Sequence, residues 1–292
     1  MAEVPVRVLR LRHCLSWALV FITVHSGPGH MGAIMDLCIS GLRVLVTAGA
    51  NGIGREIARA FVREGALVHV CDVDQKELAK LARTDPKIKS TLADVADRAQ
   101  VSRLFEEALK SLGGLDTLIN NAGISGPTGP VDEILPEDWE RCLAINITGQ
   151  FNCVRIAVPH LRQSKNASII NLSSIAGRLG YPLRTPYAAS KWAVIGFTKS
   201  LSVELGKAGI RVNSVLPGLV EGERLRNVLE NKAKAKKITV QEAEAEFVSY
   251  VAMKKTVTPQ EIADAILFLC SLRGRTISGQ ALSICGDVQM LI

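Results

Sequence analysis

The chain has 292 residues and a formal net charge of +7, and 48% of its residues are hydrophobic and 22% charged. This composition is that of an ordinary globular protein, so it excludes a disordered or collagen-like chain, and the length allows one large domain or two smaller ones. Aromatic residues make up only 4% of the chain and do not interleave with the basic residues, so the charge does not indicate nucleic-acid binding.

The seven cysteines lie at scattered positions and form no Cys-x-x-Cys pair. An odd number of cysteines without such spacing is typical of reduced, mostly buried thiols in a cytoplasmic protein. We therefore expect a cytoplasmic location, no disulfide framework and no metal site.

Residues 1–34 differ from the rest of the chain, because basic residues precede an apolar run at 15–24. That order resembles a signal peptide, but no convincing cleavage site follows, and the run is shorter than the ~20 residues that span a bilayer. Met31 and Met35 lie just before the first predicted strand. We interpret residues 1–34 as an N-terminal extension outside the fold, or as the product of a start placed too far upstream, and expect no association with membranes.

From residue 41 onward, short apolar runs alternate with helical patterns. The first run, 42–47, ends at a glycine-rich turn, and residues 55–64 carry apolar residues at helical spacing. Further strands are predicted at 66–71, 90–93, 117–119, 168–172, 210–216 and 281–285, and further helices at 100–112, 137–162, 187–207 and 259–271. This alternation is typical of a parallel sheet covered by helices on both faces, so we predict one α/β domain over residues 35–292.

Residues 221–256 interrupt the alternation with a run of lysines followed by glutamates. Thr239 and Glu242 have the spacing of a capping box, which predicts that a helix begins there. An apolar block follows at 247–253. Because long excursions between a strand and the next helix often cover an active site, we predict a lid at about 219–256.

Residues 47–54, Thr-Ala-Gly-Ala-Asn-Gly-Ile-Gly, join the first strand to the first helix. Glycines let the backbone approach a pyrophosphate, and the helix N-terminus offers free N–H groups to it. Asp72 ends the second strand, where a carboxylate binds ribose hydroxyls and repels a 2′-phosphate, and Asn51 supplies no cation for that phosphate. The sequence therefore predicts a dinucleotide site with NAD preferred over NADP, formed by Gly49, Asn51, Gly52, Ile53, Gly54, Asp72 and Val73.

Taken in order, the motifs of the chain resemble those of the short-chain dehydrogenase/reductase family. They are the turn from Thr47 to Gly54, Asp94-Val95, Asn120-Asn-Ala-Gly123, Asn146, Ser174, Tyr187-Ala-Ala-Ser-Lys191 and Pro217-Gly218. Each is modest alone, but the set at this spacing is specific and covers residues 41–292. The resemblance implies a single Rossmann-like, doubly wound domain with a seven-stranded parallel sheet, helices on both faces, and assembly as a homotetramer or dimer.

The same resemblance implies further cofactor contacts: Asp94 and Val95 at the adenine, and Asn121, Ala122 and Gly123 at the adenosine ribose. Val220 would approach the nicotinamide carboxamide. Pro217 and Gly218, which lie close to Val220 in the chain, are expected to contact the cofactor as well. The chain departs from the family pattern twice. Ala48 stands where a glycine is usual, so a small shift of the turn is expected. Gly222 stands where a threonine usually helps to hold the nicotinamide amide. The sequence therefore does not predict how the lid closes or how it contacts the cofactor.

Tyr187 and Lys191 lie four residues apart at the start of a predicted helix, so they share a face. A free phenol titrates near ~10, too high for a base at neutral pH, and a neighbouring ammonium favours the phenolate. Ser174 ends the preceding strand, where its hydroxyl would bind the substrate oxygen, and Asn146 resembles the family residue that anchors a water for proton relay to Lys191. The four residues predict alcohol oxidation in which Tyr187 takes the hydroxyl proton while a hydride passes to NAD. By the same resemblance, Tyr187 and Lys191 would also contact the cofactor.

The substrate is a small molecule that the sequence does not identify; a secondary alcohol, a polyol, a sugar and a hydroxy acid all remain open. Arg178 and Arg184 lie between Ser174 and Tyr187, where a guanidinium would suit a substrate carboxylate or lie solvated on the surface. Two alternatives also stay open: an acyl-carrier β-ketoreductase, and an NAD(H)-binding regulatory module on the same scaffold.

Overall fold

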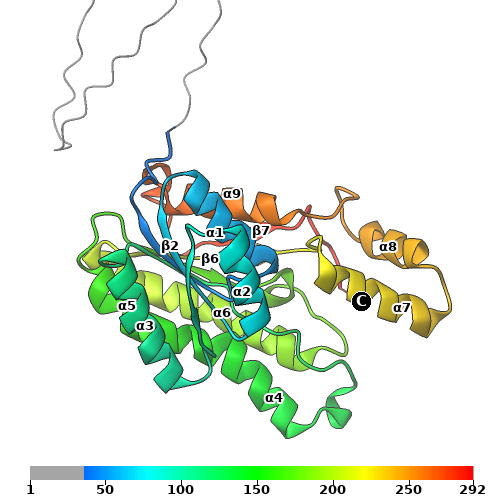
Figure 1. Cartoon of the computed structure of the whole chain (residues 1–292). Coiled ribbons are helices and arrows are strands. Elements are labelled where there is room, and N and C mark those ends of the chain that lie inside the picture. The colour runs from blue at the N-terminus through cyan, green and yellow to red at the C-terminus, as the bar shows by residue number, and fades with distance from the viewer. Residues whose placement is uncertain (1–35, 292) are drawn as a thin grey trace, which may run out of the picture. The chain divides into compact units, whose positions relative to one another are not determined.

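The computed structural model describes residues 36–291, and the fold is that of an α/β domain (Figure 1). The strands are β1 (Arg43–Thr47), β2 (Leu67–Asp72), β3 (Lys89–Leu92), β4 (Thr117–Asn120), β5 (Ser168–Leu172), β6 (Arg211–Pro217) and β7 (Ala281–Ile284). The α-helices are α1 (Gly52–Arg63), α2 (Gln75–Thr84), α3 (Arg98–Leu112), α4 (Pro136–Leu143), α5 (Gly149–Leu161), α6 (Thr185–Leu205), α7 (Glu223–Lys236), α8 (Val240–Ser249) and α9 (Pro259–Cys270).

The strands form one seven-stranded parallel sheet in the order β3-β2-β1-β4-β5-β6-β7. This confirms the predicted doubly wound architecture, and each predicted strand is present within about one residue of its bounds. The order reverses between β1 and β4, so the chain crosses to opposite faces of the sheet on either side of β1. In such sheets the carboxyl ends of the strands on either side of the reversal border the ligand crevice.

Both faces of the sheet are buried, as the continuous apolar strands predict. Along β1, Val44 and Val46 pack into a core with α1, α2 and α9, whereas Leu45 packs into a second core with α3, α5 and α6. The alternation follows from the pleat, which directs successive side chains to opposite faces. A sheet held between two cores presents a fixed edge on which loops can place functional groups.

The helices differ from the sequence prediction at three places. Helix α2 was not predicted, although Asp74 caps it by accepting from the N–H groups of Lys76 and Glu77. Helix α7 was not predicted either; its first residue follows Gly222, which provides no capping side chain. Residues 137–162 do not form one regular helix, because a π-helical turn at Ala144–Thr148 separates α4 from α5. The capping box at Thr239 and Glu242 is present and begins α8, as predicted.

The extension at residues 1–34 lies outside the described residues, so its prediction stays open. Among residues 36–291, no helix is both long enough and apolar enough to cross a membrane.

A buried hydrogen-bonded chain joins β2, β3 and α3 through His69. Its Nδ1 lies 2.8 Å from the Ser111 hydroxyl, its Nε2 lies 2.9 Å from Oγ1 of Thr91, and the Thr91 hydroxyl donates to Glu107. Because Thr91 spends its one hydrogen on the carboxylate, Nε2 donates to Thr91. The Ser111 hydroxyl has one hydrogen for two acceptors, Nδ1 of His69 and the carbonyl oxygen of Ala108 at 3.0 Å, and it donates to Nδ1 when the ring is neutral. Burial lowers the pKa of His69 to about 4, against a smaller opposing effect of Glu107.

His69 therefore makes stability depend on pH. Between about pH 4 and 6.5 the unfolded chain binds a proton that the folded chain excludes, so this residue adds up to about 1.4 kcal/mol of unfolding free energy per pH unit as the pH rises. In His69→Gln we expect a shallower slope over this window, measured by urea unfolding at several pH values. His160→Gln controls for the loss of a histidine, and a His69→Gln slope equal to that of the unmodified protein would contradict the assignment.

Candidate functional site

The predicted site residues gather at the carboxyl ends of the strands. The turn after β1, Asp72 at the end of β2, Asn121–Gly123 after β4, Ser174 after β5 and Pro217–Gly218 at the end of β6 all lie along this edge. Parallel strands bring their carboxyl ends to the same edge of a sheet. The fold therefore brings together groups that lie up to 170 residues apart in the chain.

Two glycines of the turn after β1 are needed for close packing. A Cβ on Gly49 would lie 2.6 Å from Cβ of Val70, and a Cβ on Gly54 would lie 2.5 Å from Nδ2 of Asn121 and closer still to the carbonyl oxygen of Ala48. Gly52 differs, because its φ is +52° and space around it is open. The packing glycines hold α1 against the strands, and the open one leaves room for a ligand.

Ala48 takes up a left-handed conformation, with φ of 50°. This conformation costs an L-residue roughly 1–2 kcal/mol, and it explains why glycine is usual at this position in the family. Asn121 supports the turn in this conformation, because its Nδ2 donates to the carbonyl oxygens of Thr47 and Ala48, each at 3.0 Å.

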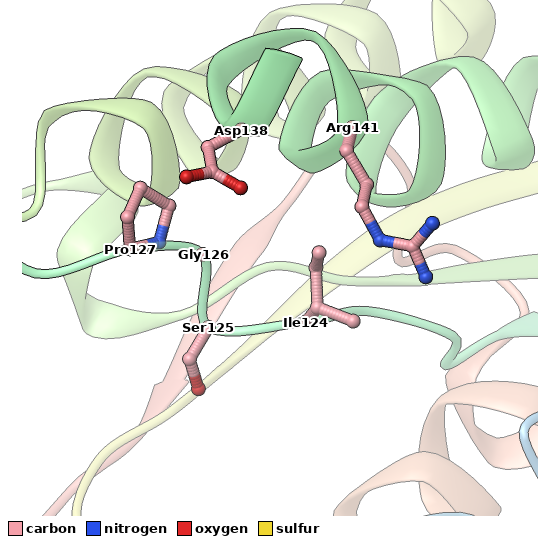
Figure 2. A pocket seen from close by; sticks show the side chains of 6 residues that line it. All are labelled: Ile124, Ser125, Gly126, Pro127, Asp138 and Arg141. Carbon is pink, nitrogen blue, oxygen red and sulfur yellow. The ribbon is translucent and has the colours of Figure 1, made fainter. Parts of the chain in front are cut away.

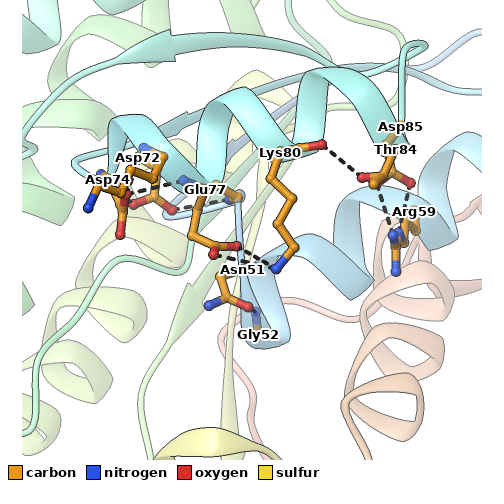
Figure 3. A network of polar contacts seen from close by, with 11 residues as sticks. Asn51, Gly52, Arg59, Asp72, Asp74, Glu77, Lys80, Thr84 and Asp85 are labelled. Atoms are coloured by element: carbon orange, nitrogen blue, oxygen red, sulfur yellow. Dashed lines mark hydrogen bonds and ion pairs between the residues drawn. The ribbon is translucent and has the colours of Figure 1, made fainter.

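The start of α1 has the donors that a dinucleotide pyrophosphate requires. Asn51 accepts from the N–H of Gly52 at 2.7 Å, whereas the next N–H groups of the first turn have no partner inside the helix. Asp72 accepts from the N–H of Ala50 at 3.1 Å and from that of Asp74 at 3.1 Å. Figure 3 shows the carboxylates of Asp72 and Asp74 at the start of α2. The donors, the carboxylate and the open space at Gly52 fit a nicotinamide dinucleotide.

Thr47 joins the end of β1 to the segment after β4. Its hydroxyl oxygen accepts from the N–H groups of Asn121 and Ala122, both at 2.9 Å. The side chain of Asn121 bonds back to the turn after β1, so both ends of this connection are fixed. These contacts place Gly123 beside the turn.

Asn146 lies in the π-helical turn and is fully buried. Its Oδ1 accepts from the N–H of Ile124 at 2.8 Å, and its Nδ2 donates to the Ile124 carbonyl at 3.0 Å and to the Ser190 hydroxyl at 3.0 Å. A Cβ on Gly123 would lie 3.2 Å from Oδ1 of Asn146 and 3.3 Å from Nζ of Lys191. Asn146 and Lys191 thus both lie close to Gly123, and a side chain at residue 123 would have to displace one of them slightly.

Helix α6 brings Tyr187 and Lys191 onto one face, with Nζ of Lys191 5.7 Å from the centroid of the Tyr187 ring. Nζ donates to the carbonyl oxygen of Leu172 at 3.0 Å, and the ammonium is buried. Burial, and secondarily the charge of Arg224, lower the pKa of Lys191 to about 8, so the group is still mainly charged at pH 7. Tyr187 packs against an apolar cluster that contains Ile175 and Ala176, the two residues that directly follow Ser174.

The remaining predicted cofactor residues lie along the same edge with different exposure. Val73 is exposed and Val220 is partly buried, whereas Val95 packs inside the second core, so a contact of Val95 with adenine would come from its main chain. Oδ1 of Asp94 accepts from the N–H of Ala96 at 2.9 Å. Gly218 is needed for packing, because a Cβ there would lie 2.7 Å from the Cα of Cys285.

The two arginines between Ser174 and Tyr187 have different environments. Arg178 bonds to Ser283 and to the carbonyl of Ala281, so it ties the segment to β7. Arg184 is not a solvated surface residue: it lies over the rings of Tyr181 and Tyr187, at 5.3 and 5.7 Å from their centroids.

Arg224 is a residue of the site that sequence reasoning missed. Its Nη2 donates to the carbonyl oxygen of Gly123 at 3.0 Å, from a position 101 residues further along the chain. Arg224 follows Gly222, whose φ of 139° is one that L side chains rarely adopt, so the usual threonine would be strained here. The predicted lid at 219–256 contains Arg224, but apart from the departure at Gly222 no predicted site feature lies next to this arginine.

Helices α7 and α8 form a small unit of their own. Leu229, Ala233, Ala243 and Phe247 make an apolar cluster between them, and Lys236 pairs with Glu246 at 2.7 Å. The unit joins the body through backbone bonds between Leu219–Glu221 and Val257, each 2.8 Å, and through Arg224. Further backbone bonds of 2.9 to 3.0 Å join residues 250–253, directly after α8, to residues 286–289.

A pocket of about 450 Å³ lies between α4 and the loop after β4. Ile124, Ser125, Gly126 and Pro127 line it from the loop, and Asp138 and Arg141 extend toward them from α4 (Figure 2). Its volume is within the range of small-molecule sites. Within residues 36–291, no group of three His, Cys, Asp or Glu side chains gathers as metal ligands would.

The turn after β1 gives a direct test of the packing argument. In Gly54→Ala, the added methyl group would displace the Ala48 carbonyl and Asn121, so we expect a loss of about 2 kcal/mol of stability and at least tenfold weaker NADH binding. Gly206→Ala adds the same methyl group in open space at a helical φ and is expected to leave both unchanged or slightly improved. Urea unfolding and NADH fluorescence measure the two effects, and NADH binding within twofold of normal in Gly54→Ala would contradict them.

Comparison with known proteins agrees with this geometry. The family model described as short chain dehydrogenase matches residues 43–233. A 3-oxoacyl-[acyl-carrier-protein] reductase FabG of Thermotoga maritima is 33% identical over 254 residues, covering 86% of this chain and 98% of that protein. A 2-(S)-hydroxypropyl-CoM dehydrogenase 3 of Xanthobacter autotrophicus is 32% identical over 249 residues, covering 84% of this chain and 95% of that protein.

Among solved structures, an NAD⁺-bound xylitol dehydrogenase superposes with a TM-score of 0.80 at 27% identity, covering 85% of this chain and 99% of that one. The match covers 95% or more of the length of each of these three proteins. The chain belongs to the short-chain dehydrogenase/reductase family and is an NAD(P)-dependent oxidoreductase that acts on alcohol or ketone groups.

Proposed function

We propose that the chain oxidises the secondary alcohol of a small substrate with NAD, or reduces the corresponding ketone, and that Tyr187 exchanges the hydroxyl proton. The observation that carries this proposal is the pairing of Tyr187 with the buried ammonium of Lys191 one turn along α6. Gly123 and Asn146 border the same ammonium, which puts the pair beside the proposed cofactor crevice.

The roles follow from the contacts of each side chain. A nicotinamide group bound here would exchange a hydride with the carbinol carbon of the substrate. Tyr187 takes the proton from the substrate hydroxyl, and Lys191 stabilises the phenolate through its charge. Ser174, whose Oγ accepts from the N–H of Ala176 at 3.2 Å, keeps its own hydrogen to donate to the substrate oxygen. Asn146 holds Ile124 and Ser190 in place around Lys191 and is the proposed anchor of a proton-relay water.

The preference for NAD rests on the charges at the end of β2. Asp72 and Asp74 lie there together, and Asn51 rather than a cation precedes Gly52. Two carboxylates would repel the 2′-phosphate of NADP, whereas Asp72 keeps lone pairs for the ribose hydroxyls of NAD. The NAD⁺-bound state of the xylitol dehydrogenase neighbour supports the same choice.

The substrate is proposed to be a polyol, a sugar or a hydroxy acid. The names of the neighbours support a hydroxylated small molecule, since they include a xylitol dehydrogenase and an aldohexose dehydrogenase. The walls would come from the loop at 124–127, the segment 176–183 and the proposed lid at 219–256, which contains the α7–α8 unit. An acyl-carrier β-ketoreductase is the second candidate, favoured by the identity with the FabG protein of Thermotoga maritima.

Assembly into a homotetramer or dimer is also proposed. Large apolar side chains are exposed on three successive helices, Trp139 on α4, Phe151 on α5 and Trp192 on α6. Exposed apolar groups of this size are typical of surfaces that contact another protein.

The assignment of Tyr187 predicts the outcome of removing one oxygen. In Tyr187→Phe, we expect turnover to fall by at least about 10³-fold, because the proton has no acceptor, while the Kd for NADH stays within a few fold. NADH formation with NAD and a panel of secondary alcohols, polyols, sugars and hydroxy acids measures turnover, and a 3-oxoacyl thioester with NADPH tests the second candidate. Undiminished turnover in the variant would overturn the assignment.

The charge of Asp72 predicts the cofactor preference. Asp72→Asn keeps an oxygen that accepts from Ala50 but loses the negative charge, so we expect the ratio of kcat/KM for NAD over NADP to fall by at least about tenfold. Asp264→Asn, on α9, is the control for the loss of one exposed carboxylate. A ratio that does not change in Asp72→Asn would assign the preference to other residues.

A further inference from the structure

Three positively charged side chains converge on residues 123–125, the loop after β4. Arg224 donates to the carbonyl of Gly123 at 3.0 Å, and Arg184 donates to the carbonyl of Ser125 at 2.8 Å. Nζ of Lys191 lies 3.3 Å from the position that a Cβ on Gly123 would occupy. The groups come from α6, from the residue directly before it and from α7, and they meet along three consecutive residues.

Their charge is not compensated inside the described part of the chain. No acidic side chain among residues 36–291 forms an ion pair with Lys191, Arg184 or Arg224. Both arginines instead bond to neutral carbonyl groups. Like charges at a partly buried site repel one another, and a bound anion would relieve that repulsion.

The two guanidinium groups still have donors to offer. Arg224 is exposed and bonds through one of its five N–H groups, and Nε of Arg184 is buried without a partner. Arg184 is also held against the ring of Tyr187, at 5.7 Å from the centroid. An oxyanion is a stronger acceptor than a backbone carbonyl, so it would replace or share these bonds.

The position of the cations favours the substrate over the cofactor as the source of that anion. The phosphates of a dinucleotide are expected at the start of α1, and its adenosine ribose at Asp72. Arg184 lies instead against the ring of Tyr187, where the proposed function places the reacting alcohol, and Arg224 bonds to Gly123, which borders the ammonium of Lys191.

We propose that the substrate is an anion, and that Arg224 and Arg184 bind its carboxylate or sulfonate group beside the carbinol that Tyr187 deprotonates. This inference rests on the proposed function and narrows its substrate class. Arg224 then has a second effect: because it belongs to α7, its bond to the anion holds the α7–α8 unit over the bound substrate. Gly222 permits the backbone conformation from which Arg224 reaches the loop.

The experiment measures binding without turnover. The full chain is saturated with NADH and titrated with butanoate, butane-1-sulfonate and butanamide, and the fluorescence of the bound NADH reports each Kd. Arg224→Gln is compared with Arg226→Gln, which removes the same charge from an exposed position two residues further along α7.

We expect at least one of the two anions to bind about tenfold or more tightly than butanamide to the unmodified protein and to Arg226→Gln. In Arg224→Gln this preference should fall to within about threefold, while the Kd for NADH stays within threefold. The anion that binds more tightly identifies the group as a carboxylate or a sulfonate.

Three results would overturn the proposal. The unmodified protein could bind butanamide and both anions equally, or the preference for the anion could fall equally in Arg224→Gln and Arg226→Gln. The third is a loss of NADH affinity of tenfold or more in Arg224→Gln, which would assign Arg224 to the cofactor. The proposed function fails separately. Its failure would appear as undiminished turnover in Tyr187→Phe, which leaves the anion preference of the NADH complex unaffected.

Discussion

The hydroxyl of Thr47 accepts two N–H groups from Asn121 and Ala122, and in doing so it joins the ends of two neighbouring parallel strands. The rest of the site takes its position from this connection. The turn after β1 is held from one side by Asn121 and from the other by Asp72, which bonds to Ala50. The turn therefore keeps the conformation in which Ala48 has a positive φ. The same connection fixes the start of the loop that runs past Asn146 and Lys191.

That loop links the cofactor end of the site to the catalytic end. Gly123, Ile124 and Ser125 are held in turn by Arg224 from α7, by Asn146 from the π-helical turn and by Arg184 from the start of α6. Three helices thus meet at three consecutive residues. A π-helical turn rotates one residue out of the regular helical position, and such turns are frequent at functional sites. Here the turn contains Asn146, whose amide holds the backbone of Ile124.

The sequence predicted the strands and the linear motifs well, because each depends on residues that are close together in the chain. Continuous apolar runs identify buried strands, and Tyr187 with Lys191 or Thr239 with Glu242 are recognisable from spacing alone. The contacts of Arg224 and Arg184 were not predictable, since their partners lie 101 and 59 residues away and are backbone carbonyls, which leave no pattern in the side chains. Helix α7 was missed because it lacks a capping side chain, and the π-helical turn because Glu137 to Arg162 reads as one helical pattern.

The central claim is that one dinucleotide lies across this edge, with its phosphates at α1 and its nicotinamide beside Lys191 and Tyr187. A crystal structure of the chain with NADH tests it most directly. We expect the pyrophosphate at the first turn of α1, the adenosine ribose at Asp72, and the nicotinamide ribose hydroxyls within about 3 Å of Nζ of Lys191. NADH bound elsewhere, or bound with its nicotinamide ribose away from Lys191 and Tyr187, would contradict the account.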